Sequence, residues 1–232
     1  MNNRTFNTLF MISSVDGKIS TWSIDERDVD KDFPKIKGLK EGLKQYYDLE
    51  KLTDFWSLNT GKVMAKIGVN NKKDEPNKID VLRFVIIDNK PHLKKSGIKY
   101  LSKKLKDLYI VTTNTKHPAT KLSSLGNVHV VRYKNKINFS DLFKRLKVEY
   151  GADRVTIQSG GTLNSILLRE GLIDELSLVI APALIGGKDT ASLVDGESIK
   201  SEKDLSMTKT LKLKEVTKLE NNYLHIVYEV LN

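Results

Sequence analysis

The fold is decided between residues 157 and 164, where the sequence reads Ile157-Gln158-Ser159-Gly160-Gly161-Thr162-Leu163-Asn164. The stretch Val155–Gln158 predicts a strand, and Thr162–Glu170 predicts a helix that ends at Gly171. The two glycines between them lack Cβ atoms, so a ligand can approach the backbone, and the amides of the first helical turn favour an anion. A tight strand–helix turn without a ligand is the alternative. The stretch does not match the G-x-G-x-x-G pattern of a Rossmann dinucleotide site.

The same alternation of strands and helices continues on both sides of this stretch. Further strands are predicted at Thr5–Ile12, Phe55–Leu58, Val81–Ile87, Leu108–Thr113, Val128–Arg132 and Leu176–Pro182. Helices or helical turns are predicted at Ile36–Lys51, Gly61–Ile67, Ser96–Leu105, Lys116–Leu125 and Ser140–Tyr150, with Ser140 as an N-cap and residues 23–36 as a loop. Met207–Leu219 and Tyr223–Val230 predict a hairpin that turns at residues 220–222.

This order of elements predicts an α/β fold. We expect a mostly parallel central sheet flanked by helices, with a C-terminal antiparallel hairpin. In such sheets ligands bind beyond the carboxyl ends of the strands, so the loops that follow strands are the candidate sites.

Composition excludes several classes of protein. The chain has 232 residues and no cysteine, so it has no disulfide, no thiolate metal site and no cysteine nucleophile. Its four histidines are His92, His117, His129 and His225. They lack metal-ligand spacing, so we predict no metal site. No apolar stretch approaches the roughly 20 residues that span a bilayer. We therefore expect a cytoplasmic protein without a membrane partner.

The net charge of +10 is concentrated in one segment. Residues 90–150 hold 15 basic and 3 acidic residues, whereas residues 1–89 hold 15 and 14 and residues 151–232 hold 9 and 12. A solvated lysine-rich surface, a nucleic-acid surface and a site for a phosphorylated cofactor are the three interpretations. The aromatic residues of this segment do not interleave as a stacking platform requires, so nucleic acid is not the favoured partner.

Other motifs are weaker. Gly61-Lys62 and Gly187-Lys188 are not followed by the hydroxyl residue of a P-loop, and no G-x-S-x-G elbow is present. Asp16 lies beside Gly17 where the first strand ends. It either caps a turn or faces a ligand, where it can donate a proton if its pKa is raised.

Taken in order, these pieces resemble the reductase domain of the RibD type, a relative of dihydrofolate reductase. The matching stretches are Ser13–Ile19, Val85–Asp88, Val111–Thr113, Gln158–Asn164, Leu168–Leu176, Ile180–Gly187 and Val194–Gly196. The resemblance covers almost the whole chain and is most specific from Gln158 to Gly187. It implies one dihydrofolate reductase-like domain over residues 1–232, in which approximately residues 88–150 form the adenosine-binding part. It also implies that the protein is a homodimer.

The resemblance also implies an activity and a cofactor. The family uses NADPH to reduce a ribosylamino-pyrimidine phosphate in riboflavin biosynthesis, opening the ribose to a ribityl chain. The implied cofactor-binding residues are Ile12 and Ser13 at the nicotinamide, Gly160, Gly161, Thr162, Leu163 and Asn164 at the pyrophosphate, Asn89, Thr112 and Thr113 along the adenosine half, and also Gly61 and Lys62. A 2′-phosphate beside the basic segment would favour NADPH over NADH.

On the substrate side the resemblance implies a binding role for Ser14 and Gln158 and a catalytic role for Asp16. The sequence departs from the family on this side. Gln158 stands where an acidic residue is usual, Asn59–Lys66 replaces a Gly-x-x-Thr stretch that ends in an acidic pair, and an Arg-rich helix end and a Ser-x-Trp have no clear match. A reductase of dihydrofolate, a pterin or another small carbonyl compound therefore stays an alternative, as does a catalytically silent nucleotide-binding protein. The zinc ligands of the deaminase that is often fused to this domain are absent.

Overall fold

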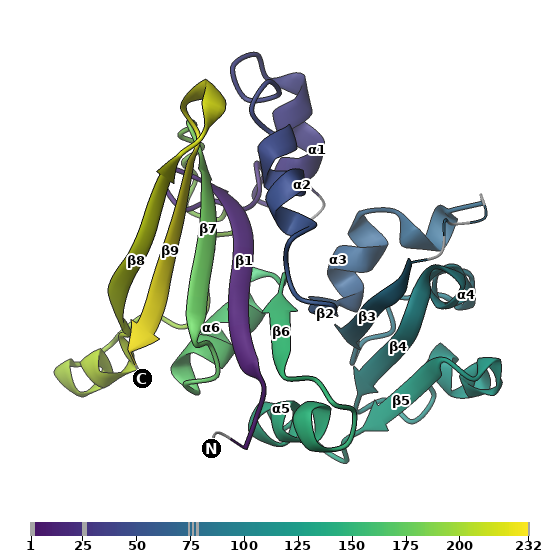
Figure 1. Ribbon diagram of the computed structural model, residues 1–232. Coiled ribbons are helices and arrows are strands. Elements are labelled where there is room, and N and C mark those ends of the chain that lie inside the picture. Colours follow the sequence, from purple (N-terminus) through teal and green to yellow (C-terminus); the bar gives the residue numbers. More distant parts are fainter. Residues whose placement is uncertain (1–2, 25–26, 74, 76, 78, 232) are drawn as a thin grey trace. The chain divides into compact units, whose positions relative to one another are not determined.

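The computed structural model describes residues 3–24, 27–73, 75, 77 and 79–231. Contacts within the chain divide it into two compact units, each with its own strands (Figure 1). Unit 1 comprises Met1–Thr5 and Asp54–Ser159, and unit 2 comprises Phe6–Thr53 and Gly160–Asn232. The basic segment and the expected adenosine-binding part therefore belong to unit 1.

The strands of unit 1 are all parallel to their neighbours, in the order β5-β4-β3-β2-β6. They are β2 (Trp56–Thr60), β3 (Ile79–Ile87), β4 (Leu105–Thr112), β5 (Val128–Arg132) and β6 (Arg154–Ile157). The helices are α3 (Gly61–Lys66), α4 (Lys95–Lys104) and α5 (Phe139–Val148), with short 3₁₀ helices at Val69–Asn71, Pro118–Lys121 and Ser123–Leu125. Because the strands are parallel, the loops that follow β2, β3 and β4 leave the same edge of the sheet.

Side chains cover the unit 1 sheet on both faces. Leu108 and Ile110 of β4 pack in one apolar cluster with Leu101 of α4. Tyr109 lies between them in sequence and so points to the other face, where its ring lies 4.8 Å from that of Tyr150, just after α5. A strand covered on both faces needs apolar residues at successive positions, which explains the continuous apolar runs of the sequence.

Unit 2 combines a parallel pair with an antiparallel hairpin, in the order β1-β7-β9-β8. Its strands are β1 (Phe6–Ser14), β7 (Glu175–Ala181), β8 (Thr210–Lys218) and β9 (Leu224–Leu231). Its helices are α1 (Val29–Asp32), α2 (Lys44–Glu50) and α6 (Gly161–Arg169), with 3₁₀ helices at Phe33–Lys35, Glu202–Met207 and Glu220–Asn222. One apolar cluster joins β1 and β7 to α2, and within it the rings of Phe10 and Tyr46 stack with centroids 5.1 Å apart.

The architecture confirms the expected α/β fold with mostly parallel strands and a C-terminal hairpin, but three local predictions were wrong. Of the helix expected over Ile36–Lys51 only α2 forms, after a run of turns that contains Gly38, whose φ of 89° a helix does not allow. Asn138, not Ser140, caps α5 and accepts a hydrogen bond from the Asp141 amide at 3.0 Å. The loop expected at residues 23–36 contains the short helix α1. Among the described residues, no helix has both the length and the apolar character to cross a membrane.

Candidate functional site

The residues expected at the site fall into two groups, one in each unit. Unit 1 holds Gly61, Lys62, Asn89, Thr112, Thr113 and Gln158, and unit 2 holds Ile12, Ser13, Ser14, Asp16 and the turn from Gly160 to Asn164. The unit 1 residues other than Lys62 lie at the carboxyl end of a strand or directly after one, where open α/β sheets bind ligands.

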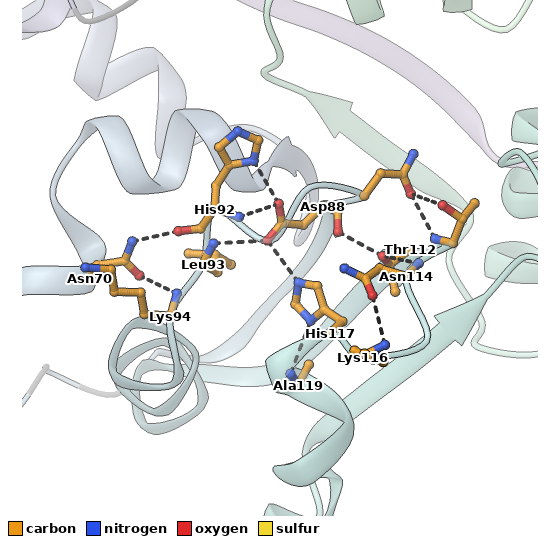
Figure 2. A network of polar contacts seen from close by, with 12 residues as sticks. Asn70, Asp88, His92, Leu93, Lys94, Thr112, Asn114, Lys116, His117 and Ala119 are labelled. Carbon is orange, nitrogen blue, oxygen red and sulfur yellow. Dashed lines mark hydrogen bonds and ion pairs between the residues drawn. The ribbon is translucent and has the colours of Figure 1, made fainter.

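Asp88 forms the centre of the polar network that Figure 2 shows in unit 1. It follows β3 directly, and its carboxylate is fully buried. Oδ1 accepts hydrogen bonds from the backbone N–H and the Nδ1 of His92, both at 3.0 Å. Oδ2 accepts from the Leu93 amide at 3.1 Å and from Nε2 of His117 at 3.0 Å. One carboxylate thus holds the loop after β3 and the loop after β4.

These hydrogen bonds decide the charge of Asp88. Burial by itself raises the pKa of this carboxyl group, because a dry environment disfavours the anion. The hydrogen bonds from the side chains of His117 and His92 and from the His92 and Leu93 amides outweigh burial and lower the pKa below its usual value. Asp88 is therefore an anion at neutral pH, although it is buried.

The same network fixes three of the expected cofactor residues beside one another. The hydroxyl of Thr112 donates to the backbone oxygen of Asp88 at 2.9 Å and accepts from the Asn114 amide at 3.0 Å. Oδ1 of Asn89 accepts from the backbone N–H of Thr113 at 2.9 Å and from its hydroxyl at 3.3 Å. Asn89, Thr112 and Thr113 therefore form one hydrogen-bonded edge across β3 and β4.

Asn70 extends the network toward α4. Its Nδ2 donates to the backbone oxygen of His92 at 2.8 Å, and its Oδ1 accepts from the Lys94 amide at 2.8 Å (Figure 2). These contacts fix the far end of the loop that Asp88 holds at its near end. The loop from Asn89 to Lys94 is thereby held at both ends.

Gly61 begins α3, directly after β2, and lies against Asp88. A β-carbon at this position would come within 2.2–2.6 Å of the Asp88 carboxyl atoms. Thr60 caps the helix by accepting from the Val63 amide at 3.2 Å, and Lys62 is exposed on its first turn. The loops that follow three neighbouring strands thus meet at one buried carboxylate.

A chain of side-chain hydrogen bonds orients Gln158 after β6. Nδ2 of Asn59 donates to Oγ of Ser57 at 2.9 Å, and this hydroxyl donates to Oε1 of Gln158 at 3.3 Å. The backbone N–H of Gln158 donates to Leu58 at 2.9 Å. Gln158 is therefore held through its amide oxygen, and it is neutral at the position where the resemblance predicts an acidic residue.

In unit 2, Asp16 joins the loop after β1 to the loop after β7. Its Oδ1 accepts from the hydroxyl of Ser14 at 2.5 Å and from the Ile185 amide at 3.2 Å, and its Oδ2 accepts from the Gly186 amide at 2.6 Å. The bond from Ser14 and that from Gly186 are the main reasons why the pKa of Asp16 falls to about 2. Asp16 is therefore ionised at neutral pH and is suited to accept hydrogen bonds, not to donate a proton.

Ile12 and Ser13 lie in β1 before this loop. Both side chains are buried, and the hydroxyl of Ser13 donates to the backbone oxygen of Ser14 at 3.1 Å. On the other side of the loop, Nζ of Lys18 donates to the backbone oxygen of Thr190 at 2.9 Å. The segment that begins at Thr190 lies against the glycine turn, where the Asp195 amide donates to the backbone oxygen of Gly161.

The glycine turn at the start of α6 contains two glycines in different surroundings. A β-carbon at Gly161 would lie 2.2 Å from the backbone oxygen of Ser192 and 2.5 Å from Oδ2 of Asp195. A β-carbon at Gly160 would meet no atom within 4 Å, and no side chain caps the helix. Packing therefore explains the glycine at 161 but not the one at 160.

Further along α6, Nδ2 of Asn164 donates to the backbone oxygen of Leu193 at 2.8 Å, which also ties the helix to the segment after Thr190. Thr162 is exposed and Leu163 is partly buried in the first turn. The loop with Ser14 and Asp16 and the first turn of α6 are thus connected within unit 2 by residues 190–195.

Sequence reasoning missed three residues of these networks: Asp88, His117 and Asp195. Asp88 offered a signal, since it is an acid directly after an apolar strand, as Asp16 is. Asp195 lies in the stretch Val194–Gly196 that carried part of the resemblance. His117 offered none, because its partner Asp88 is 29 positions away. Among the described residues, no group of three or more His, Asp or Glu side chains could hold a metal ion.

Comparison with known proteins gives a match over most of the chain. A sequence model described as the RibD C-terminal domain matches residues 5–225. A 2,5-diamino-6-ribosylamino-4(3H)-pyrimidinone 5′-phosphate reductase of Methanothermobacter thermautotrophicus is 47% identical over 49 residues, which are 21% of this chain and 23% of that protein. The matched region is therefore less than a quarter of this relative.

Solved structures are similar over the whole chain. Acinetobacter baumannii RibD has a TM-score of 0.70 and 18% identity, covering 100% of this chain and 59% of that one. A riboflavin biosynthesis reductase of Saccharomyces cerevisiae has a TM-score of 0.62 and 16% identity, covering 100% of this chain and 92% of that one. At such identities the likeness concerns the fold, which is dihydrofolate reductase-like.

Proposed function

Because the chain belongs to the RibD C-terminal domain family, we propose that it is an NADPH-dependent reductase. Its proposed substrate is a ribosylaminopyrimidine 5′-phosphate of riboflavin biosynthesis, such as 5-amino-6-(5-phosphoribosylamino)uracil or its diaminopyrimidinone analogue. The name of the Methanothermobacter relative supports this substrate class. The bound cofactor would supply a hydride to C1′ of the ribosyl group, while the bond from C1′ to the ring oxygen breaks and that oxygen takes a proton.

The observation that carries the proposal is the open surface over Gly160. A glycine loses more backbone entropy on folding than any other residue, yet no neighbouring atom requires one at this position. A ligand that approaches the backbone would require it. The uncapped first turn of α6 offers amide N–H groups and a positive dipole end to an anion, and a dinucleotide pyrophosphate has the matching charge.

The remaining residues receive roles that agree with their chemistry. Asn89, Thr112 and Thr113 present amide and hydroxyl groups suited to the adenosine half, and the 15 basic residues of the segment 90–150 favour a phosphorylated nucleotide. Gln158 would hydrogen-bond the substrate. Since Asp16 is anionic, its proposed role is to hold substrate hydroxyl groups rather than to protonate the leaving oxygen.

Thermal denaturation with NADPH or NADH tests the cofactor assignment. We expect NADPH to raise the melting temperature far more than NADH, because a ligand stabilises the native state according to its affinity. Equal shifts, or none, would refute the assignment. Loss of NADPH absorbance with the two ribosylaminopyrimidine phosphates and with dihydrofolate then identifies the substrate.

The neutral Gln158 supports a second candidate, a nucleotide-binding protein without catalysis. That candidate predicts NADPH binding with no oxidation of NADPH by any of the three substrates.

That the chain forms a single domain and a homodimer are further proposals. Sedimentation equilibrium measures the oligomeric state directly.

A further inference from the structure

His117 is a fully buried histidine whose two ring nitrogens both have partners. Nδ1 accepts a hydrogen bond from the Ala119 amide at 3.1 Å, and Nε2 lies 3.0 Å from Oδ2 of Asp88 (Figure 2). A nitrogen that accepts from an N–H carries no proton. The proton of the neutral ring therefore lies on Nε2, which donates to the carboxylate.

The two halves of this arrangement belong to different loops. His117 lies after β4, and Asp88 lies after β3, where its carboxylate also takes the His92 and Leu93 amides. A buried carboxylate that loses a partner must find another or be solvated, because an unsatisfied buried charge is costly. A change at His117 should therefore be felt in the loop after β3, which His117 does not itself belong to.

We propose that Asp88 and His117 are a positioning pair that holds the loops after β3 and β4 in the geometry that binds the adenosine half of NADPH. The proposal rests on the proposed function for the identity of the ligand. Asn89 follows Asp88 and accepts from Thr113, so the pair and the Asn89–Thr113 contacts are two ties between the same two loops. Neither Asp88 nor His117 needs to touch the cofactor for this role.

Two substitutions separate the two nitrogens of His117. In His117→Asn the side-chain oxygen can take the place of Nδ1 and still accept from the Ala119 amide, but nothing reaches Asp88. In His117→Gln the longer amide can place its NH₂ near the position of Nε2 and still donate to Asp88. His92→Ala is a matched control for the loss of one side-chain hydrogen bond to Asp88. Its ring is about one-third exposed, so water can take its place at Oδ1, and the backbone N–H of residue 92 still donates to Asp88.

The experiment measures two quantities on the full chain. Hydrogen exchange of the Leu93 and Thr113 amides, without ligand, reports whether the loops are held, since both amides donate within them. Titration with NADPH reports affinity. For His117→Asn we expect faster exchange at both amides and about a tenfold weaker Kd for NADPH, with kcat at saturating NADPH changed less than about twofold. His117→Gln and His92→Ala should stay near the wild type in both measurements.

Unchanged exchange in His117→Asn would overturn the proposal whatever the cofactor, and so would faster exchange with unchanged NADPH affinity. The opposite result, with faster exchange and weaker NADPH binding in His117→Gln but not in His117→Asn, would also overturn it. The hydrogen bond from the Ala119 amide to His117 would then hold the loops, and the bond from His117 to Asp88 would not. A wild-type protein that binds no NADPH would instead refute the proposed function. The exchange rates would then still decide whether the pair holds the two loops.

Discussion

Gly61 and Asp88 fit together only because position 61 has no side chain: a β-carbon there would lie 2.2 Å from Cγ of Asp88. Gly61 is the first residue of α3, and Asp88 follows β3, the strand next to β2. A negative charge beside the start of a helix is favourable, because the helix dipole is positive at that end. The carboxylate therefore packs against the first residue after β2 and accepts hydrogen bonds from the loops after β3 and β4.

The first prediction concerns this contact. Gly61→Ala should destabilise the protein by about 1–3 kcal/mol, because the added methyl group must displace a buried carboxylate that four hydrogen bonds hold. Urea denaturation followed by circular dichroism measures the change. Gly160→Ala serves as the control, since its added methyl group meets no atom within 4 Å. An unchanged urea midpoint for Gly61→Ala would contradict the close contact.

The second prediction separates the two glycines of the turn before α6. Gly160→Ala should change stability by less than about 1 kcal/mol, because its backbone conformation suits alanine and no atom lies within 4 Å of the added methyl group, although glycine is the better N-cap residue. It should nevertheless weaken NADPH binding, since the methyl group would occupy the surface proposed for the pyrophosphate. Isothermal titration calorimetry measures this affinity.

Gly161→Ala is the matched partner of that variant. Its methyl group would collide with the backbone oxygen of Ser192 and the carboxylate of Asp195, so it should lower the melting temperature before any ligand is added. Full NADPH affinity in Gly160→Ala would argue against cofactor binding at this turn.

Much of the fold could be predicted because its signals are local. Val81–Ile87 is apolar at almost every position, and the structure places it in β3, which has a neighbouring strand on each side. The helix predicted over Ile36–Lys51 forms only from Lys44 onward, and its apolar spacing gives no sign of the positive φ at Gly38 or of the close packing at Gly42. A β-carbon at Gly42 would lie 2.4 Å from the ring of Tyr223, a residue 181 positions later in the sequence. No local pattern records such a contact.

In the site, too, local features could be predicted from the sequence and long-range contacts could not. The resemblance points to Asn89, Thr112 and Thr113. In the structure Thr113 donates to Asn89, and Thr112 donates to the backbone oxygen of Asp88, the residue before Asn89. The state of Asp16 could not be predicted, because two of the hydrogen bonds that lower its pKa come from Ile185 and Gly186. A raised pKa would have let Asp16 donate a proton near neutral pH, whereas its hydrogen-bond partners lower that pKa.

The third prediction follows from the lowered pKa of Asp88. A carboxyl group whose pKa is lower in the folded than in the unfolded state adds stability above its unfolded pKa of about 3.9. That stability is lost as the pH falls through the folded value, because the unfolded chain then binds a proton more readily. Wild-type stability should therefore decrease below about pH 4 more steeply than that of Asp88→Asn.

Denaturant titrations of both proteins at a series of pH values test this. Asp88→Asn should be less stable at neutral pH, because its NH₂ group cannot accept two of the four donors that face the carboxylate. The stability difference should be constant from about pH 5 to pH 8 and shrink toward acid. A difference that does not depend on pH would show that the Asp88 carboxyl has the same pKa in both states.

The last prediction concerns Asp16 and the acid–base chemistry of the proposed reaction. With its pKa lowered to about 2, Asp16 stays ionised throughout the range in which enzymes are assayed. Asp16→Asn should therefore reduce kcat/KM by weakening the contacts to Ile185 and Gly186, but it should leave the pH dependence of kcat/KM unchanged between about pH 5 and pH 8. Ser14→Ala removes the largest cause of the lowered pKa of Asp16. It should also leave the pH profile of kcat/KM unchanged, since the usual pKa of 3.8 is still below this pH range.

A limb of the pH profile that disappears in Asp16→Asn would mean that the Asp16 carboxyl titrates near neutrality. Its hydrogen bonds to Ser14 and Gly186 would then have to be broken when substrate binds, because they stabilise the anion and oppose a proton on Asp16.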